Sequence, residues 1–173
     1  MRSRHFHPGL ALAAVVLLLD QASKILLLEA FRVPIFERPP SYAPGPSVEI
    51  LPFFNLSLVW NWGVSFGLLQ GDAPWQRWVL ILFVVVVTGG LVVWLARVED
   101  RGTGLAIGAV IGGALGNLID RVFYGAVVDF VDLHAFGYHW YVFNLADSAI
   151  VLGVAGLLYV SFFGAGRSKG WNG

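Results

Sequence analysis

Two polar clusters interrupt hydrophobic stretches of this sequence, and their side chains are the ones that could do chemistry. The clusters are Asn117, Asp120 and Arg121 in "GNLIDRV", and Asn144, Asp147 and Ser148 in "FNLADS". Both follow the spacing i, i+3, i+4, which puts three side chains on one face of a helix. Asp147 has no basic partner at i±3 or i±4, and an ionised residue inside a membrane span costs about 2.5–3.5 kcal/mol on insertion scales. Its presence therefore indicates a function.

Carboxylates in pairs point to acid and base catalysis. Asp129 and Asp132 are expected on the loop that connects the two clusters, in "VVDFVDLH", so several carboxylates should meet at one surface patch. Two carboxyl groups that share a proton can act together, one as base on a water and the other as acid on a leaving amine. Spacing alone ranks Asp120 with Asp147 as the pair.

Other catalytic chemistries have little support. The chain contains no cysteine, which excludes a thiolate nucleophile or thiolate metal site. Its histidines show no metal-ligand spacing such as HExxH and none falls in the polar clusters; they are His5, His7, His134 and His139. We expect neither a metal nor another cofactor.

The amino-acid composition indicates which class of fold positions these side chains. Of 173 residues, 57% are hydrophobic and 13% charged, and the mean hydropathy is +0.73. A soluble domain has about 25% charged residues, so we predict an all-α integral membrane protein with one domain over residues 1–173. The expected spans are about 10–30, 78–96, 104–122 and 140–163. The formal net charge of zero argues against a nucleic-acid partner.

The first hydrophobic segment resembles a secretory signal peptide, because Arg2 and Arg4 precede it. No small-x-small cleavage site closes it, and the apolar run resumes after "DQASK", so a retained helix is the better interpretation. An even number of spans puts both termini on one side. That side would carry six of the eleven basic residues, Arg2, Arg4, Arg97, Arg101, Arg167 and Lys169. The positive-inside rule then predicts cytoplasmic termini, with outer segments at about 31–77 and 123–139. Because the third span runs outward and the fourth returns inward, both polar clusters are expected at the same depth, near the outer boundary.

The longer outer segment changes character along its length. Its first part, "VPIFERPPSYAPGPS", is rich in proline and predicts irregular structure. The next part, "FFNLSLVW", is aromatic and β-branched, which predicts a strand and a small sheet outside the membrane.

Each polar feature also has a structural explanation. Asp20 and Lys24 are i, i+4 partners that could form a self-neutralising ion pair, Asp120 and Arg121 could form an interfacial cap, and Asp132 with His134 would be solvated loop residues. Glycines also recur every fourth residue in the third span, at Gly104, Gly108, Gly112 and Gly116. This ridge favours close helix packing. With Gly113, its outer end could instead leave room for an extended peptide, and the sequence does not decide between the two.

Five segments in order resemble the sequence boxes of the lipoprotein signal peptidases, also called signal peptidase II. They are "DQASK", "NWGVSFG", "GGALGNLIDRV", "VVDFVD" and "FNLADS", and they extend from residue 20 to residue 148. The resemblance implies an aspartyl endopeptidase of the bacterial inner membrane, which we expect to be a monomer. Its substrates would be diacylglyceryl-modified prolipoproteins, cleaved just before the lipidated cysteine at the periplasmic face. It also implies four membrane helices, an outer β-cradle and a short outer helix.

The resemblance assigns roles residue by residue. It implies that Asp129 and Asp147 are the catalytic pair, in place of the Asp120 and Asp147 that spacing favours. The supporting or substrate-binding residues that it implies are Asn61, Gly63, Gly113, Asn117, Asp120, Arg121, Asn144, Asp20 and Lys24, the last two as a structural pair close to membrane lipids.

Two other functions compete with a peptidase. A small proton-coupled carrier would use the acidic residues as a relay, but carriers show repeated halves with sites at the midplane, and here the acids gather at one face. A non-enzymatic assembly subunit would explain the glycine ridge but not the convergent acids.

Overall fold

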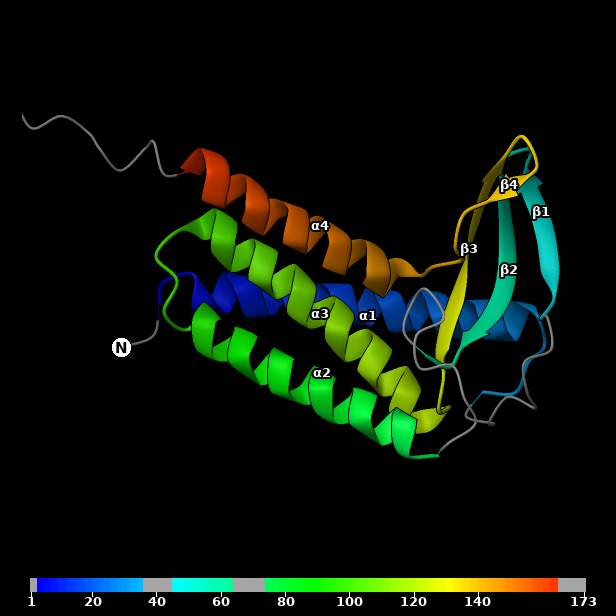
Figure 1. Ribbon diagram of the computed structural model, residues 1–173, viewed down its shortest axis with the longest axis horizontal. Helices are drawn as coiled ribbons and strands as arrows, with labels where there is room; N and C mark the ends of the chain where they lie inside the picture. The colour runs from blue at the N-terminus through cyan, green and yellow to red at the C-terminus, as the bar shows by residue number, and fades with distance from the viewer. Residues whose placement is uncertain (1–2, 36–44, 64–73, 165–173) are drawn as a thin grey trace, which may run out of the picture.

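The computed structural model describes residues 3–35, 45–63 and 74–164 of the chain. Four helices run side by side and a small sheet lies across one end of them, which we call the sheet end (Figure 1). The helices are α1 (Phe6–Ala30), α2 (Pro74–Leu95), α3 (Arg101–Phe123) and α4 (Leu145–Tyr159), the last continued by a π-helical turn at Val160–Gly164. The strands are β1 (Ser47–Leu51), β2 (Phe54–Asn61), β3 (Val127–Ala135) and β4 (Tyr138–His139).

All four helices are long and apolar enough to cross a membrane, which confirms the number of spans predicted for the chain. The first three begin three or four residues earlier than expected. The fourth begins at Leu145, not at Trp140, because Asn144 caps it. The Asn144 side chain accepts from the Asp147 backbone N–H, and the Asp147 side chain accepts from the Asn144 backbone N–H. This capping box fixes the helix start.

The glycine ridge of α3 packs against α1. A Cβ added at Gly108 would collide with the carbonyl oxygen of Gly9, and one at Gly112 would lie 2.8 Å from Cβ of Val16. Gly113, on another face of α3, approaches the backbone of Ala146 in α4. The helix backbones therefore pack as a small-residue ridge allows. Neighbouring helices fill the space beside these glycines, which leaves no room there for a peptide.

The four strands form an antiparallel sheet in the order β1-β2-β3-β4. This confirms a strand within "FFNLSLVW", and it corrects the expectation that Asp129 lies in a loop, because Asp129 is in β3 opposite Val59. The predicted irregular stretch falls largely on residues 36–44, outside the described residues. Residues 31–35, 45–63 and 124–144 contain no helix, so the short outer helix stays a prediction.

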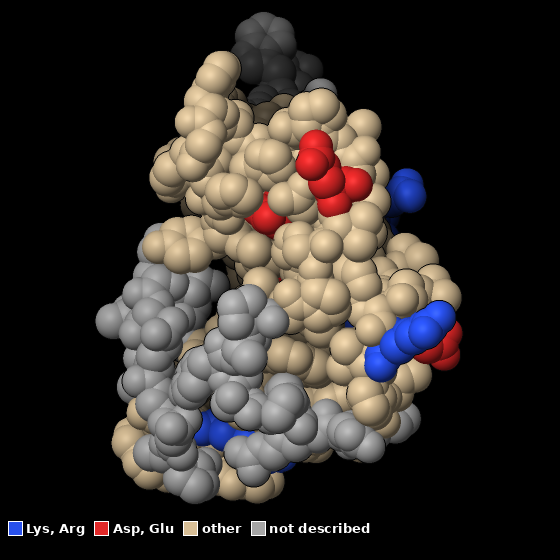
Figure 2. Space-filling view, turned by 90° about the vertical axis from the view of Figure 1, so that its right-hand side faces the viewer, with Lys and Arg blue, Asp and Glu red and all other residues tan. Residues whose placement is uncertain are grey.

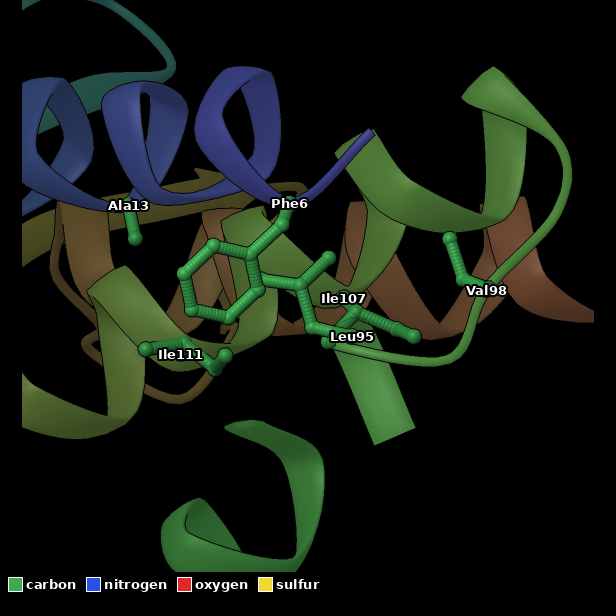
Figure 3. Packing of buried hydrophobic residues seen from close by; sticks show 6 residues of the cluster. All are labelled: Phe6, Ala13, Leu95, Val98, Ile107 and Ile111. Atoms are coloured by element: carbon green, nitrogen blue, oxygen red, sulfur yellow. The ribbon is translucent and has the colours of Figure 1, made fainter. Parts of the chain in front are cut away.

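Two apolar clusters hold the bundle at its two ends. At the end away from the sheet, Phe6, Leu95 and Ile107 pack between α1, α2 and α3 (Figure 3). At the sheet end, Leu28 of α1 and Leu58 and Val128 of the sheet are almost fully buried together. The sheet is therefore attached to the last turns of α1. Both ends of the connection from α3 through β3 to α4 consequently lie at the sheet end (Figure 1).

We predict that Gly108→Ala lowers the stability of the bundle, because the new methyl group meets the Gly9 carbonyl. Overpacking of this kind costs about 1–3 kcal/mol. Gly90→Ala is the matched control in α2, since a Cβ there meets nothing within 4 Å. It should be neutral or stabilising by up to about 1 kcal/mol through helix propensity. Thermal unfolding of both variants in detergent measures the difference, and equal melting temperatures would contradict the packing role.

Candidate active site

Asn144 connects the two carboxylates that the resemblance pairs. Its side-chain amide donates to Asp129 Oδ1 at 2.7 Å, and its backbone N–H donates to Asp147 Oδ2 at 3.3 Å. Asn144 is fully buried, so its position is set by the start of α4 on one side and by β3 on the other. One residue thus brings a carboxylate on a strand and a carboxylate on a helix to the same place.

Asn117 of α3 is the second amide at this site. Its Nδ2 donates to Asp147 Oδ1 at 2.8 Å, and its Oδ1 accepts from Asn144 Nδ2 at 3.0 Å and from Lys24 Nζ at 3.2 Å. The polar clusters of "GNLIDRV" and "FNLADS" therefore meet, as their equal depth in the membrane predicted. The partner of Asp147 across this contact is Asn117, and Asp120 points elsewhere.

Asp129 is 2% exposed and lies between two amides. In addition to Asn144, Asn61 Nδ2 donates to its Oδ2 at 3.1 Å. Asn61 stands two residues beyond Val59, the register partner of Asp129, so the two side chains are diagonal neighbours on one face of the sheet. Burial, and after it the negative charge of Asp147, raises the pKa of the Asp129 carboxyl to about 7, against the lowering effect of the Asn61 hydrogen bond. Near neutral pH the Asp129 carboxyl can therefore take up or release a proton.

Asp120 belongs to a buried ionic cluster around Lys24. The Lys24 ammonium lies 2.8 Å from Asp20 Oδ2 and 2.7 Å from Asp120 Oδ2, and all three side chains are at most 3% exposed. Lys24 is thus more than the partner of Asp20, because it also neutralises a carboxylate of α3. A buried ion needs such a partner, since removing one member leaves an uncompensated charge.

Backbone donors complete this cluster and join it to the catalytic candidates. The Ala146 N–H donates to Asp20 Oδ1 at 2.9 Å, which links α1 to the first turn of α4. The Val128 N–H donates to Asp120 Oδ2 at 3.1 Å, next to Asp129 in the chain. The two carboxylates therefore hold, through the backbone, the residues adjacent to Asp147 and Asp129.

Gln21 is a site residue that the sequence analysis missed. Its amide nitrogen donates to Asp20 Oδ2 at 3.2 Å, to Asp120 Oδ1 at 3.0 Å and to the Gly116 carbonyl at 3.2 Å. Its position inside the "DQASK" box was the available signal, because an amide within an apolar segment requires partners as a carboxylate does.

Arg121 closes one side of the site. Its guanidinium donates to the carbonyl oxygen of Gly63 at 3.1 Å and to that of Asn117 at 3.3 Å, and the Gly63 N–H donates to Asn61 Oδ1 at 3.2 Å. Arg121 thus ties α3 to the residues that follow β2. Its Nε is buried and has no hydrogen-bond partner within the described part of the chain. Phe66 and Gly67, which belong with Gly63 to the sequence box "NWGVSFG", lie outside the described residues.

Asp132 corrects a prediction, because it is a buried strand residue and not a solvated loop residue. It is 5% exposed, and its Oδ2 accepts from Asn55 Nδ2 at 3.1 Å and from Ser57 Oγ at 3.2 Å. Its Oδ1 lies 2.9 Å from His139 Nδ1. Burial raises the pKa of this carboxyl, but these hydrogen bonds outweigh it and the net shift is downward. Asp132 stands three residues from Asp129, so the alternation of a strand turns it away from the catalytic candidates. His134 is half-buried and contacts Asn55.

The surface at the sheet end shows few charged side chains among the described residues (Figure 2). This agrees with the burial of its carboxylates, since Asp20, Asp120, Asp129 and Asp132 are all at most 5% exposed. The site is therefore a partly desolvated cluster of paired acids held by amides, which suits proton transfer to and from a bound water and a substrate.

Comparison with known proteins agrees with this chemistry. The sequence model of the family described as "Signal peptidase (SPase) II" matches residues 12–163. A lipoprotein signal peptidase of Methylobacterium sp. (strain 4-46) is 47% identical over 159 residues, which cover 92% of this chain and 91% of that protein. One from Rhodopseudomonas palustris (strain ATCC BAA-98 / CGA009) is 44% identical over 165 residues, covering 93% and 95% of the two chains.

Solved structures give the same result for the fold. Two structures, each described as a "bacterial membrane enzyme structure by the in meso method", are 28% identical to this chain with TM-scores of 0.74 and 0.71. The first covers 96% of this chain and 94% of its own, and the second 91% and 93%. The protein is a multi-pass membrane protein, and the match of sequence and fold over almost its whole length shows that it belongs to the signal peptidase II family, a family of aspartic peptidases.

Proposed function

We propose that this protein removes the signal peptide from diacylglyceryl-modified prolipoproteins, with Asp129 and Asp147 as its catalytic pair. One observation carries the assignment of the pair: Asn144 donates to both carboxylates from a single buried position. Asp120 is the alternative partner that spacing favours, but its carboxylate is occupied by Lys24, Gln21 and the Val128 N–H. It supports the pair and does not belong to it.

The mechanism uses the pair as a unit with one shared proton. In the resting enzyme the proton is on Asp129, because its pKa of about 7 lies well above that of an ordinary carboxyl. Asp147 is the base of the pair and lies in the first turn of α4, where the helix dipole favours an anion. Asp147 takes a proton from water, and the oxygen adds to the scissile carbonyl carbon. Asp129 then gives its proton to the peptide nitrogen as the C–N bond breaks. The proton that Asp147 took from water passes to Asp129, which restores the starting state.

Donors around the pair hold the substrate carbonyl. The Nε–H of Arg121 is buried without a partner in the described chain, so it is free to donate to the carbonyl oxygen and to the oxyanion that replaces it. Asn61 and Asn117 keep the carboxylates in place by the hydrogen bonds given above. The backbone around Gly63 is positioned to contact the peptide, since Arg121 and Asn61 both hold it.

The sheet would act as the cradle for the peptide around the scissile bond, together with a short outer helix. We place the sheet end at the periplasmic face of the bacterial inner membrane and both termini in the cytoplasm. The distribution of basic residues supports this orientation, because Arg97 and Arg101 flank the connection between α2 and α3 at the opposite end. In this proposal the chain is a single domain and works as a monomer.

A proton-coupled carrier is not favoured. The buried acidic residues of the described chain gather at the sheet end and not at the midplane, and the family is one of peptidases.

Asp129→Asn and Asp147→Asn should each abolish cleavage, because an amide can neither accept the proton of water nor supply one to the leaving nitrogen. The assay is the release of signal peptide from a purified diacylglyceryl-modified precursor, with globomycin, the cyclic-peptide inhibitor associated with this family, as the reference for blocked activity. Loss of at least about 10³-fold is expected, as for removal of a general acid or base.

Asp132→Asn is the matched control for these variants. It is also a buried aspartate of β3, but its contacts are with Asn55, Ser57 and His139. We expect it to retain cleavage. Full activity in Asp129→Asn would exclude Asp129 from the catalytic pair.

The raised pKa of Asp129 predicts two linked pH effects. Cleavage should decline as pH rises through about 7, because the acid form of the pair is lost. Below pH 3.8 the Asp129 carboxyl is protonated in both the folded and the unfolded chain. Between pH 3.8 and about 7 only the folded chain keeps this proton. This stabilising contribution is therefore lost as pH rises through about 7.

Asp129→Asn cannot ionise, so its melting temperature relative to that of the wild type should increase as pH rises from about 4 to about 7 and then level off. Thermal unfolding of both proteins across this pH range measures the effect. A difference that does not vary with pH would show that Asp129 titrates like an ordinary carboxyl.

A further inference from the structure

A groove runs along the membrane part of the bundle on the far side of α3 from the catalytic pair. It has a volume of about 620 Å³ and lies between α1, α2 and α3. Its walls include Leu10 and Leu17 of α1, Thr88 and Gly89 of α2, and Ile111 and Leu118 of α3. The seven residue steps from Leu10 to Leu17 make it about 10 Å long, at a rise of 1.5 Å per residue.

The end of this groove that lies away from the sheet is closed by side chains. Phe6, Leu95 and Ile111 come together there from three helices, as Figure 3 shows, and Leu10 and Val92 of the groove wall pack against them. The groove therefore forms a pocket with one closed end, within the stretch where all four helices are apolar enough for the membrane interior.

The chemistry of the wall excludes a polar occupant. Apart from Thr88, the wall consists of glycine, alanine and aliphatic side chains. The Thr88 hydroxyl is on a side chain 7% exposed and has no hydrogen-bond partner among the described residues. A stable buried water needs two to four polar partners. Hydrocarbon is the material that surrounds a protein at this depth.

The position of the groove excludes the substrate. Ile111 and Leu115 line the groove, whereas Gly113 and Asn117, each two residues further on, face α4 and the catalytic pair. Two residues along an α-helix correspond to a rotation of about 200°. A lipid tail attached beside the scissile bond would thus have to pass around α3 to enter the groove.

We propose that the groove is a binding site for one acyl chain of a bilayer phospholipid, which fills the space between α1 and α2. A chain one methylene wide fits a narrow apolar groove that is open to the surrounding lipid. A helix of another protein or of a second copy lying over the groove is the alternative that the experiment below distinguishes. The site is independent of the catalytic assignment.

Two adjacent glycines of α2 allow a matched test. A Cβ at Gly89 or at Gly90 meets nothing within 4 Å, so both positions tolerate a large side chain, but of the two only Gly89 lines the groove. Gly89→Trp should fill the groove, whereas Gly90→Trp should extend into the bilayer. Thr88→Val removes the hydroxyl and keeps the shape.

The full-length proteins are purified in mild detergent, and bound phospholipid is measured by native mass spectrometry. Each delipidated protein is then titrated with palmitoyl-oleoyl-phosphatidylglycerol while its melting temperature is followed, since a ligand of the folded state raises it. Wild type, Gly90→Trp and Thr88→Val should retain a lipid and gain stability. Gly89→Trp, or the smaller Gly89→Leu, should lose both effects. Glycerophosphoglycerol, which has no acyl chains, should not stabilise any of them.

Several outcomes would overturn the proposal. These are equal lipid retention by the Gly89 and Gly90 variants, stabilisation by the headgroup alone, and a loss of retention in Thr88→Val, which would indicate a polar occupant. A dimer in place of a lipid-bound monomer, abolished by Gly89→Trp but not Gly90→Trp, would show that a second copy covers the groove.

Discussion

Lys24 holds the sheet end of the bundle together, because its ammonium group lies between the carboxylates of Asp20 and Asp120. Each carboxylate then accepts a backbone N–H from a different segment, Ala146 of α4 or Val128 of β3. In a membrane interior a buried charge without a partner is costly. The requirement that these three charges compensate one another therefore also fixes where α4 begins and where β3 runs.

The catalytic candidates depend on that arrangement. Asp147 and Asp129 are each one residue away from a backbone N–H held by the ionic cluster, and Asn144 spans the gap between them. Asn144 also caps α4, so the residue that ends the extended segment is the one that aligns the two acids. The hydrogen bonds that cap α4 are therefore also among those that align the candidate pair.

Close packing in the membrane makes this alignment rigid. The glycines of α3 bring its backbone against α1 and α4, and the carboxylate of Asp20 reaches the space beside Gly116, where any side chain would collide with it. α2 contacts this core less completely, which leaves the groove beside α1. A lipid chain in that groove would complete the packing that α2 alone does not supply.

Much of this protein was predictable from its sequence. Composition determines membrane residence, and hydrophobic length determines four spans, because crossing a bilayer requires about 20 apolar residues. Helical spacing and topology placed both polar clusters at one depth, and the family boxes pointed to Asp129 and Asp147. These properties are local in the chain.

The partners of the acidic residues were decided only by the tertiary structure. Spacing ranked Asp120 beside Asp147 and placed Asp129 and Asp132 in a loop. In the folded chain Asp120 instead pairs with Lys24, Asp132 accepts a hydrogen bond from Asn55, and Asp129 accepts one from Asn144. Which carboxylates meet depends on the register between β2 and β3 and on the packing of α1, α3 and α4. Those contacts join residues about 15 to 126 positions apart, and no local pattern in the sequence encodes them.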